Sequence, residues 1–273
     1  MSLMNKKFDL NHEWEVPSFD CIEFKSKKSK YALTIPVINE GDRIRNQLLK
    51  IDSIFQGTLD IIIADGGSED GSLDDFFLKK VGVRALLRTK VSQGLGFQLR
   101  MAYFWILNQN YQGIITVDGN NKDGMSAISQ FIEKLDKGYD YVQGSRYLTG
   151  GRSENTPIDR IIGNKFIHAP LLSFFAKYKF TDTTNGFRGY SKSFLEDNRL
   201  KIFRGIFKEY ELLFYLTFMA GKLDKKICEI PVERIYPNKY SQNRVPTKIN
   251  TYYKKGQIFV SLLKVLLGFY NPK

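Results

Sequence analysis

Short apolar runs alternate with longer amphipathic segments in the first half of the chain, and this order limits the fold more than any other feature. Runs rich in β-branched and aromatic residues, which we predict to be strands, occupy residues 31–38, 59–64, 83–87, 113–117 and 140–144. Segments with helical spacing occupy residues 42–55, 73–80 and 96–108. Because strands that alternate with helices usually pair in parallel, we predict an α/β fold with a mainly parallel central sheet flanked by helices.

Polar clusters follow three of these predicted strands at the point where each strand ends. Glu40 follows the first strand, Asp65 the second and Asp118 the fourth. Parallel strands end at a common edge of the sheet, where ligands of such folds bind. Each acid alone could be a helix cap or a solvated loop residue. Three of them at one edge predict a polar binding site.

Five motifs occur in order along the chain. They are Pro36-Val37-Ile38-Asn39-Glu40, Ala64 to Ser72, Asp118-Gly119-Asn120, Gly144-Ser145-Arg146-Tyr147 and Asp182 to Arg188. Together they resemble the motifs of family 2 glycosyltransferases, and the last two resemble the dolichyl-phosphate mannose synthase branch and its bacterial polyprenyl relatives. The resemblance implies a GT-A, Rossmann-like fold. It also implies an inverting hexosyltransferase that uses a UDP- or GDP-sugar.

The same resemblance assigns roles to residues of the first three motifs. Pro36, Glu40 and Asp65 would hold the nucleoside of the donor. Asp118 and Asn120 would face the diphosphate and hold Mg²⁺ or Mn²⁺.

Two positions in the metal motif depart from the family pattern. Asn120 stands where the second acid of the Asp-x-Asp motif belongs, and Lys122 stands where the mannose synthase branch has a neutral metal ligand. An ammonium about 4 Å from a divalent cation would cost roughly 8 kcal/mol at an effective dielectric constant of about 20. One hypothesis is that Lys122, in place of a metal ion, neutralises the charge of the departing diphosphate. The alternative is a lysine that points to water.

Basic residues in the second half of the chain are candidate phosphate ligands. A guanidinium can donate two hydrogen bonds to one phosphate, which suits a diphosphate donor or a phosphorylated acceptor. Arg146, Arg188 and Lys248 lie in motifs that resemble the family, and we predict that they contact phosphate. Weaker candidates are Arg152, Arg160, Arg234 and Arg244.

Three acids are candidates for a catalytic base. A hydroxyl acceptor would need a carboxylate within hydrogen-bond reach, and Asp182, Glu209 and Glu211 are the candidates. Glu209 and Glu211 could instead favour the start of an apolar helix. A phosphate acceptor is already anionic and needs no base.

The charge of the chain favours anionic partners. Forty-one Lys and Arg against twenty-nine Asp and Glu give a net charge of +12, which suits nucleic acid, phosphorylated substrates or an acidic membrane surface. No helix-turn-helix, zinc-finger or RNP pattern is present, so nucleic acid is not expected. The two cysteines, Cys21 and Cys228, are far apart and predict a reducing, cytoplasmic environment without a disulfide framework.

Two apolar segments suggest contact with a membrane surface. Residues 157–180 are predicted to form a helix, and residues 257–270 are too short to span a bilayer, which takes about 20 residues. Together with nine basic and three acidic residues over 222–255, they predict a peripheral protein at the inner face of an anionic membrane. The alternative is that these helices pack on the core or form a homo-oligomer interface.

We expect one main domain in the 273 residues. Residues 1–30 are predicted to be an N-terminal arm, with residues 1–3 as a cloning remnant, residues 31–250 the GT-A domain, and residues 251–273 a C-terminal amphipathic helix. The expected acceptor is a cell-envelope glycan, such as a surface polysaccharide or lipopolysaccharide, or a lipid-linked molecule. Because no spanning helices follow the domain, a glycan is preferred. The alternatives are a polyprenyl-phosphate sugar synthase and a non-catalytic scaffold that binds nucleotide sugars.

Overall fold

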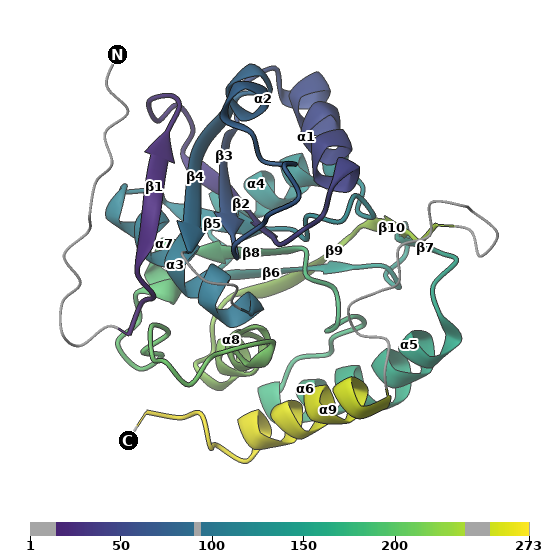
Figure 1. Cartoon of the computed structure of the whole chain (residues 1–273). Helices are drawn as coiled ribbons and strands as arrows, with labels where there is room; N and C mark the ends of the chain where they lie inside the picture. The colour runs from purple at the N-terminus through teal and green to yellow at the C-terminus, as the bar shows by residue number, and fades with distance from the viewer. Residues whose placement is uncertain (1–14, 90–93, 238–251, 273) are drawn as a thin grey trace.

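An eight-stranded sheet lies at the centre of the computed structural model, which describes residues 15–89, 94–237 and 252–272 (Figure 1). The strand order is β1-β4-β3-β2-β5-β8-β6-β9. Its strands are β1 (Phe19–Glu23), β2 (Tyr31–Val37), β3 (Asp60–Asp65), β4 (Val83–Thr89), β5 (Gly113–Thr116), β6 (Tyr141–Ser145), β8 (Arg188–Ser191) and β9 (Ile227–Pro231). A separate parallel pair consists of β7 (Arg152–Glu154) and β10 (Glu233–Ile235).

Helices cover both faces of this sheet. The α-helices are α1 (Asp42–Phe55), α2 (Asp75–Lys80), α3 (Leu95–Asn108), α4 (Ile128–Asp136), α5 (Ile158–Ile162), α6 (Ala169–Ala176), α7 (Lys192–Leu195), α8 (Glu211–Lys222) and α9 (Tyr252–Leu266). A 3₁₀ turn, η1, spans Met125–Ala127, and a π-helix, η2, spans Gly163–His168.

The four central strands are parallel to one another, as predicted. β2 pairs with β3 and β5, and β3 pairs with β4, all in parallel, while β8 runs antiparallel between β5 and β6. Every residue of β2 and β3 is buried. Strands buried on both faces are typical of a parallel sheet covered by helices, and their continuous apolar sequences explain this position.

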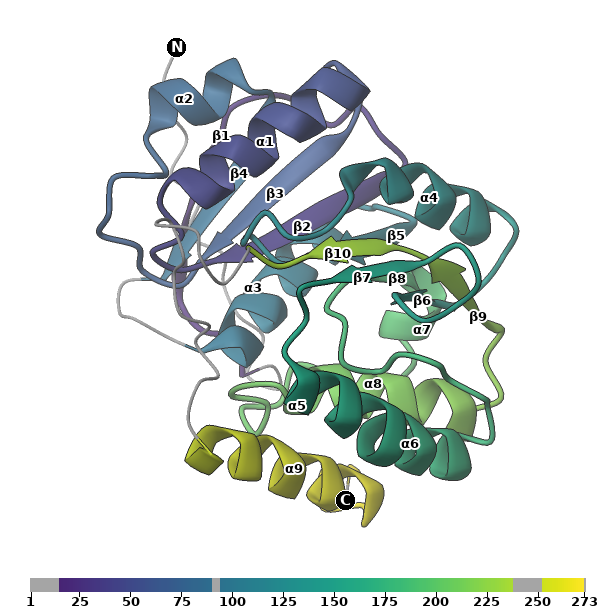
Figure 2. The same ribbon diagram turned by 90° about the vertical axis from the view of Figure 1, so that its right-hand side faces the viewer.

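Two apolar cores flank the sheet. One core joins the sheet to α1, α2 and α4 through residues such as Leu48, Phe77 and Phe131. The other joins it to α3 and α8 through residues such as Trp105 and Leu216. Helices α6 and α9 pack against α8, and Figure 2 shows α5, α6 and α9 together at one end of the molecule.

The predicted N-terminal arm contains a strand that the sequence analysis did not identify. Phe19–Glu23 forms β1 and pairs antiparallel with β4, with Phe19 and Cys21 buried. The basic run that follows is tied to the sheet, because the backbone N–H groups of Lys28 and Ser29 donate to the buried Asp60 carboxylate at 2.8 and 2.9 Å. Residues 15–30 are therefore part of the domain.

The predicted helix over residues 157–180 is interrupted. The structure has α5, the π-helix η2 and α6 in sequence, and the helix ends at Lys177, which has a left-handed φ of 52°. Helix α9 covers part of the predicted C-terminal helix and is followed by a turn with Gly268 at φ 83°. The predicted amphipathic helix corresponds to α9, which spans Tyr252–Leu266.

The close contact between α6 and α8 allows a test of the packing. A Cβ added to Gly221 would lie 1.8 Å from the Ala176 carbonyl oxygen, whereas a Cβ on Gly163 would meet nothing within 4 Å. We expect Gly221→Ala to destabilise the protein by about 3 kcal/mol, because backbone must move. Gly163→Ala should change stability by less, or raise it by up to about 1 kcal/mol through helix propensity. Urea unfolding measures both, and equal stabilities would contradict the packing.

Candidate active site

The acids predicted to form the site follow three neighbouring strands. Glu40, Asp65 and Asp118 come after β2, β3 and β5, which are adjacent and parallel, so all three lie at the carboxyl edge of the sheet. Side chains from the covering helices hold these loops. Gln47 of α1 donates to the Asp118 carbonyl at 2.9 Å and accepts from the Asn121 N–H at 2.7 Å.

Asp65 and Glu40 both have charged partners. The buried Asp65 carboxylate accepts hydrogen bonds from the Gly67 and Ser68 N–H groups at 3.1 and 2.7 Å, and it pairs with Arg88 at 2.6 Å. Glu40 pairs with Arg43 at 2.9 Å. Pro36 lies in buried β2, opposite Ala64. Asp65 therefore fixes the glycine turn that ends β3.

Arg234 joins the two acids of the loop after β5. Its Nη2 lies 2.9 Å from Asp118 Oδ2, and its Nη1 lies 2.5 Å from Asp123 Oδ2. Burial raises the pKa of Asp123, the Asp118 charge adds to this effect, and Arg234 opposes it. Burial alone would lower the pKa of Arg234, but Asp123 and Asp118 hold it well above its ordinary range. The guanidinium is therefore a permanent charge.

Backbone hydrogen bonds fix Arg234 against that loop. Gly124 N–H donates to the Glu233 carbonyl at 3.0 Å, and Ile235 N–H donates to the Lys122 carbonyl at 2.8 Å. The sequence analysis ranked Arg234 among the weaker candidates. Its partners Asp123 and Asp118 lie 111 and 116 positions away in the sequence, so no local pattern revealed its role.

Lys122 and Arg160 face the ring and hydroxyl of Tyr236. Lys122 Nζ lies 4.7 Å from the ring centroid, and Arg160 Nη1 lies 3.2 Å from the hydroxyl. Burial lowers the pKa of Lys122, and Arg234 lowers it further. Burial tends to raise the pKa of Tyr236, but Arg234 and Arg160 outweigh it and lower this pKa. We call Lys122, Arg160 and Arg234 the cation cluster; it lies beside Asp118.

Comparison with known proteins identifies the family. The family model described as "Glycosyl transferase family 2" matches residues 33–199, which is more than half of the chain. The chain belongs to glycosyltransferase family 2. The predicted enzyme class, a glycosyltransferase, and the predicted family are thereby confirmed.

Two relatives of this glycosyltransferase have curated names. The chain is 27% identical to a "Dolichyl-phosphate hexose transferase" of Haloferax volcanii, over 86% of this chain and 93% of the relative. It is 26% identical to a "Polyprenol monophosphomannose synthase" of Mycolicibacterium smegmatis, over 63% of this chain and 65% of the relative. These relatives confirm the predicted branch of the family.

Solved structures confirm the GT-A-like fold of the glycosyltransferase. The chain resembles glucosyl-3-phosphoglycerate synthase from Mycobacterium tuberculosis, crystallised with Mn²⁺, UDP and glucosyl-3-phosphoglycerate. The TM-score is 0.60 at 15% identity, over 89% of this chain and 81% of that one. Mannosyl-3-phosphoglycerate synthase from Rubrobacter xylanophilus gives a TM-score of 0.61 at 14% identity, over 87% and 72% of the two chains. At these identities the likeness concerns the fold alone.

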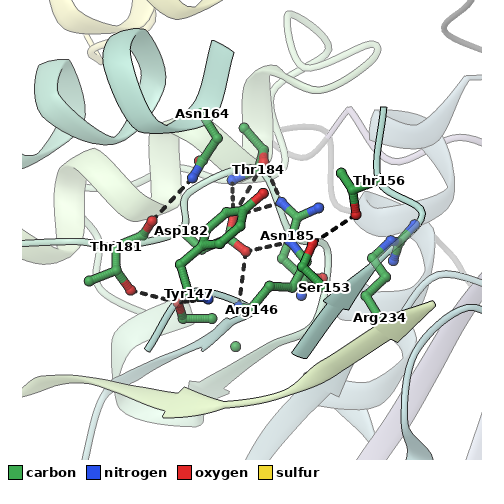
Figure 3. A network of polar contacts seen from close by, with 12 residues as sticks. Arg146, Tyr147, Ser153, Thr156, Asn164, Thr181, Asp182, Thr184, Asn185 and Arg234 are labelled. Atoms are coloured by element: carbon green, nitrogen blue, oxygen red, sulfur yellow. Dashed lines mark hydrogen bonds and ion pairs between the residues drawn. The ribbon is translucent and has the colours of Figure 1, made fainter. Parts of the chain in front are cut away.

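Arg146 and Arg188, both predicted to contact phosphate, have partners within the protein. Figure 3 shows Arg146 turned toward Asp182 and Thr184, with Nε–Oδ2 and Nη2–Oδ1 distances of 2.6 and 2.9 Å to Asp182. Arg188 is buried, and its guanidinium donates to the carbonyls of Thr183, Asn185 and Leu213 and to Thr217 Oγ1. In this structure both guanidinium groups bind protein atoms, and a role of the two arginines in phosphate binding stays a prediction.

The motif that contains Arg188 supports Asp118 instead. A Cβ added to Gly186 would lie 2.4 Å from Asp118 Oδ1, so the loop over residues 182–187 packs directly against that carboxylate. Only glycine allows this approach. The arginines of the glycosyltransferase motifs therefore hold a loop that positions Asp118. Lys248, the third predicted phosphate ligand, and Arg244 lie outside the described residues.

The three candidate bases all have structural contacts. The buried Asp182 carboxylate is held by Arg146. Glu211 accepts the Glu209 N–H at 2.6 Å, and Ser261 Oγ lies 3.4 Å from its other oxygen. Glu209 receives a backbone hydrogen bond from Leu95 at the start of α3, and burial, with the Glu211 charge, raises its pKa.

The central ion pair of the glycosyltransferase is open to a direct test. We expect Arg234→Met to destabilise the protein by about 3–5 kcal/mol, because Asp123 would be left buried without its partner. Adding Asp123→Asn should recover part of this loss. The matched control is Arg152→Met on the neighbouring strand β7, where the exposed Arg152 pairs with Glu154 and Glu233 and should change stability little. Urea unfolding at pH 7 distinguishes the variants, and equal effects would contradict this account.

Proposed function

We propose that this enzyme transfers a sugar, with inversion, from a nucleoside diphosphate to a polyprenyl phosphate. The observation that carries the proposal is the cation cluster beside Asp118 at the carboxyl edge of the sheet. A phosphate oxygen of the acceptor attacks the anomeric carbon as the bond to the donor diphosphate breaks. The electron pair leaves with the diphosphate, and positive side chains stabilise the charge that develops there.

The donor would lie along the edge formed by β2, β3 and β5. Pro36, Glu40 and Asp65 are proposed to border the nucleoside, while Asp118 and Asn120 border the diphosphate. This assignment follows the strand ends, because ligands of open α/β sheets bind beyond them. About a third of the Asp118 side chain is exposed, at 32%, so it is accessible to a ligand. UDP- and GDP-sugars are both retained as donors.

The contacts of the candidate bases favour a phosphate acceptor. Asp182, Glu209 and Glu211 each hold a backbone or side-chain partner, and a hydroxyl acceptor would require one of them to release it. A phosphate acceptor attacks without a base. The names of the relatives, which refer to dolichyl phosphate and polyprenol, agree with this choice. We therefore prefer a lipid phosphate to the cell-envelope glycan that the sequence favoured.

Amide substitutions test this choice. With a polyprenyl phosphate acceptor, Glu209→Gln should reduce kcat less than about tenfold, because removing a general base costs roughly 10²–10⁴-fold. Glu211→Gln, the other candidate base at the same helix start, should likewise reduce kcat less than about tenfold. Transfer of labelled sugar measures kcat, and a thermal melt of each variant confirms folding. A larger loss for folded Glu209→Gln alone would make Glu209 the base and a hydroxyl the acceptor.

We also propose that the surface formed by α5, η2, α6 and α9 rests on an anionic membrane, at the inner face of the cytoplasmic membrane. Large apolar side chains are exposed there, including Ile158 at 68%, Phe166 at 74% and Phe174 at 78%. Lysines lie on the same group of helices, Lys165 on η2 and Lys254, Lys255 and Lys264 on α9. Apolar side chains among basic ones suit an anionic bilayer. Helix α9 is tied to α5 by a Lys255–Asp159 pair at 2.7 Å (Figure 2).

No described helix has both the length and the apolar character needed to span a bilayer. Contact through a surface is therefore the mode that we propose for these helices. The alternative occupant of the same surface is a second copy of the chain, and the following experiment distinguishes the two.

Paired substitutions of exposed phenylalanines test the membrane contact. Phe166→Ser with Phe174→Ser should weaken sedimentation with phosphatidylglycerol vesicles by about tenfold or more, because burying each ring contributes roughly 1.5–3 kcal/mol. The control is Phe76→Ser on α2, equally exposed at 81% but at the other end of the molecule (Figure 2). Phosphatidylcholine vesicles should bind the wild type less. The proposed membrane contact would be contradicted if the wild type binds no vesicles but forms dimers, and the double variant does not form these dimers.

A further inference from the structure

The divalent cation seen in related folds does not suit the side chains around Asp118. A Mg²⁺ or Mn²⁺ ion that binds with a nucleotide takes one or two carboxylates of the protein, and phosphate and water oxygens complete its ligands. Within residues 15–89, 94–237 and 252–272, no group of three or more His, Cys, Asp or Glu side chains could hold a metal ion. Asn120 offers one amide oxygen, and its amide nitrogen lies 3.4 Å from Asp118 Oδ2. One amide and one carboxylate that already has a partner make a poor metal site.

Arg234 already neutralises the carboxylates of this loop. Its guanidinium pairs with Asp118 and with the buried Asp123 at the same time. The Arg234 side chain is only 6% exposed, and the backbone bonds around Glu233 and Ile235 hold the strand in place. A cation that is fixed in this way needs no reorganisation when negative charge develops nearby.

Lys122 and Arg160 add further positive charge beside this pair. Both lie against Tyr236, whose ring and hydroxyl they contact at 4.7 and 3.2 Å. The cation cluster therefore carries three positive charges against the two carboxylates that Arg234 pairs. Positive charge in excess repels a divalent cation and attracts a diphosphate.

We infer that Arg234 and Lys122 replace the divalent metal, so that this enzyme binds and releases its nucleoside diphosphate without Mg²⁺ or Mn²⁺. The inference rests on the proposed function, because it concerns the diphosphate of the same donor. Arg234 acts as a positioning residue that holds and neutralises Asp118. Lys122 acts as the group that contacts the departing diphosphate, whose new charge it balances.

Binding of UDP and GDP tests the inference without depending on turnover. Isothermal titration of the metal-stripped enzyme in EDTA is compared with the same titration in Mg²⁺ and in Mn²⁺. We expect the Kd of the nucleotide that binds to change less than about fivefold. A larger gain in affinity with either metal would overturn the inference and leave the proposed transfer intact. If neither nucleotide binds under any condition, the proposed function fails and this inference fails with it.

Variants of the cation cluster give the second measurement. Lys122→Gln should weaken nucleotide binding in EDTA by about tenfold or more, because it removes a charge-assisted contact to phosphate. The matched control is Lys137→Gln, an exposed lysine at the end of α4 that should leave Kd unchanged. Transfer by the wild type should persist in EDTA. Unchanged binding by folded Lys122→Gln, or transfer that stops in EDTA and returns with Mg²⁺, would overturn the inference.

Discussion

Parallel pairing of β2 with β3 on one side and with β5 on the other is the constraint on which the site depends. It brings the loops that follow three strands to one edge, although their acids are up to 78 positions apart in the sequence, from Glu40 to Asp118. Water does not reach the backbone of buried strands. Polar side chains therefore form the hydrogen bonds that the backbone lacks where the strands end. Gln98 of α3 donates to the Val37 carbonyl, and Gln47 of α1 joins both sides of the loop after β5.

Buried ion pairs in this molecule fix the conformation of loops and add little to the free energy of unfolding. Arg146 with Asp182 and Arg234 with Asp123 are both enclosed, and removing water from such pairs offsets most of their attraction. The two pairs fix the positions of loops. Arg146 with Asp182 holds the loop that packs against Asp118, and Arg234 with Asp123 holds the loop that contains Asp118.

The alternating strands and helices could be predicted because the spacing of apolar residues within each segment indicates its secondary structure. Helix α1 has the predicted bounds, β2 differs by one residue at its end, and β3 is shifted by one residue at both ends. Strand β1 was missed because five residues at a sheet edge carry only a brief alternation of burial. The arginines were harder, because their roles depend on distant partners: Arg188 bonds to Leu213 and Thr217 of α8, and Arg234 to Asp118, 116 positions away. No local pattern reveals such partners.

A thermal-shift titration with UDP-, GDP- and dTDP-sugars tests the central claim, that the carboxyl edge of β2, β3 and β5 binds a sugar nucleotide. A ligand that binds only the folded state raises the Tm with the logarithm of its concentration. The account predicts such a rise for at least one of these donors and a smaller rise in Lys122→Gln, which removes a positive charge beside the diphosphate. If no sugar nucleotide raises the Tm, or if Lys122→Gln responds as the wild type does, the donor diphosphate does not lie at this edge.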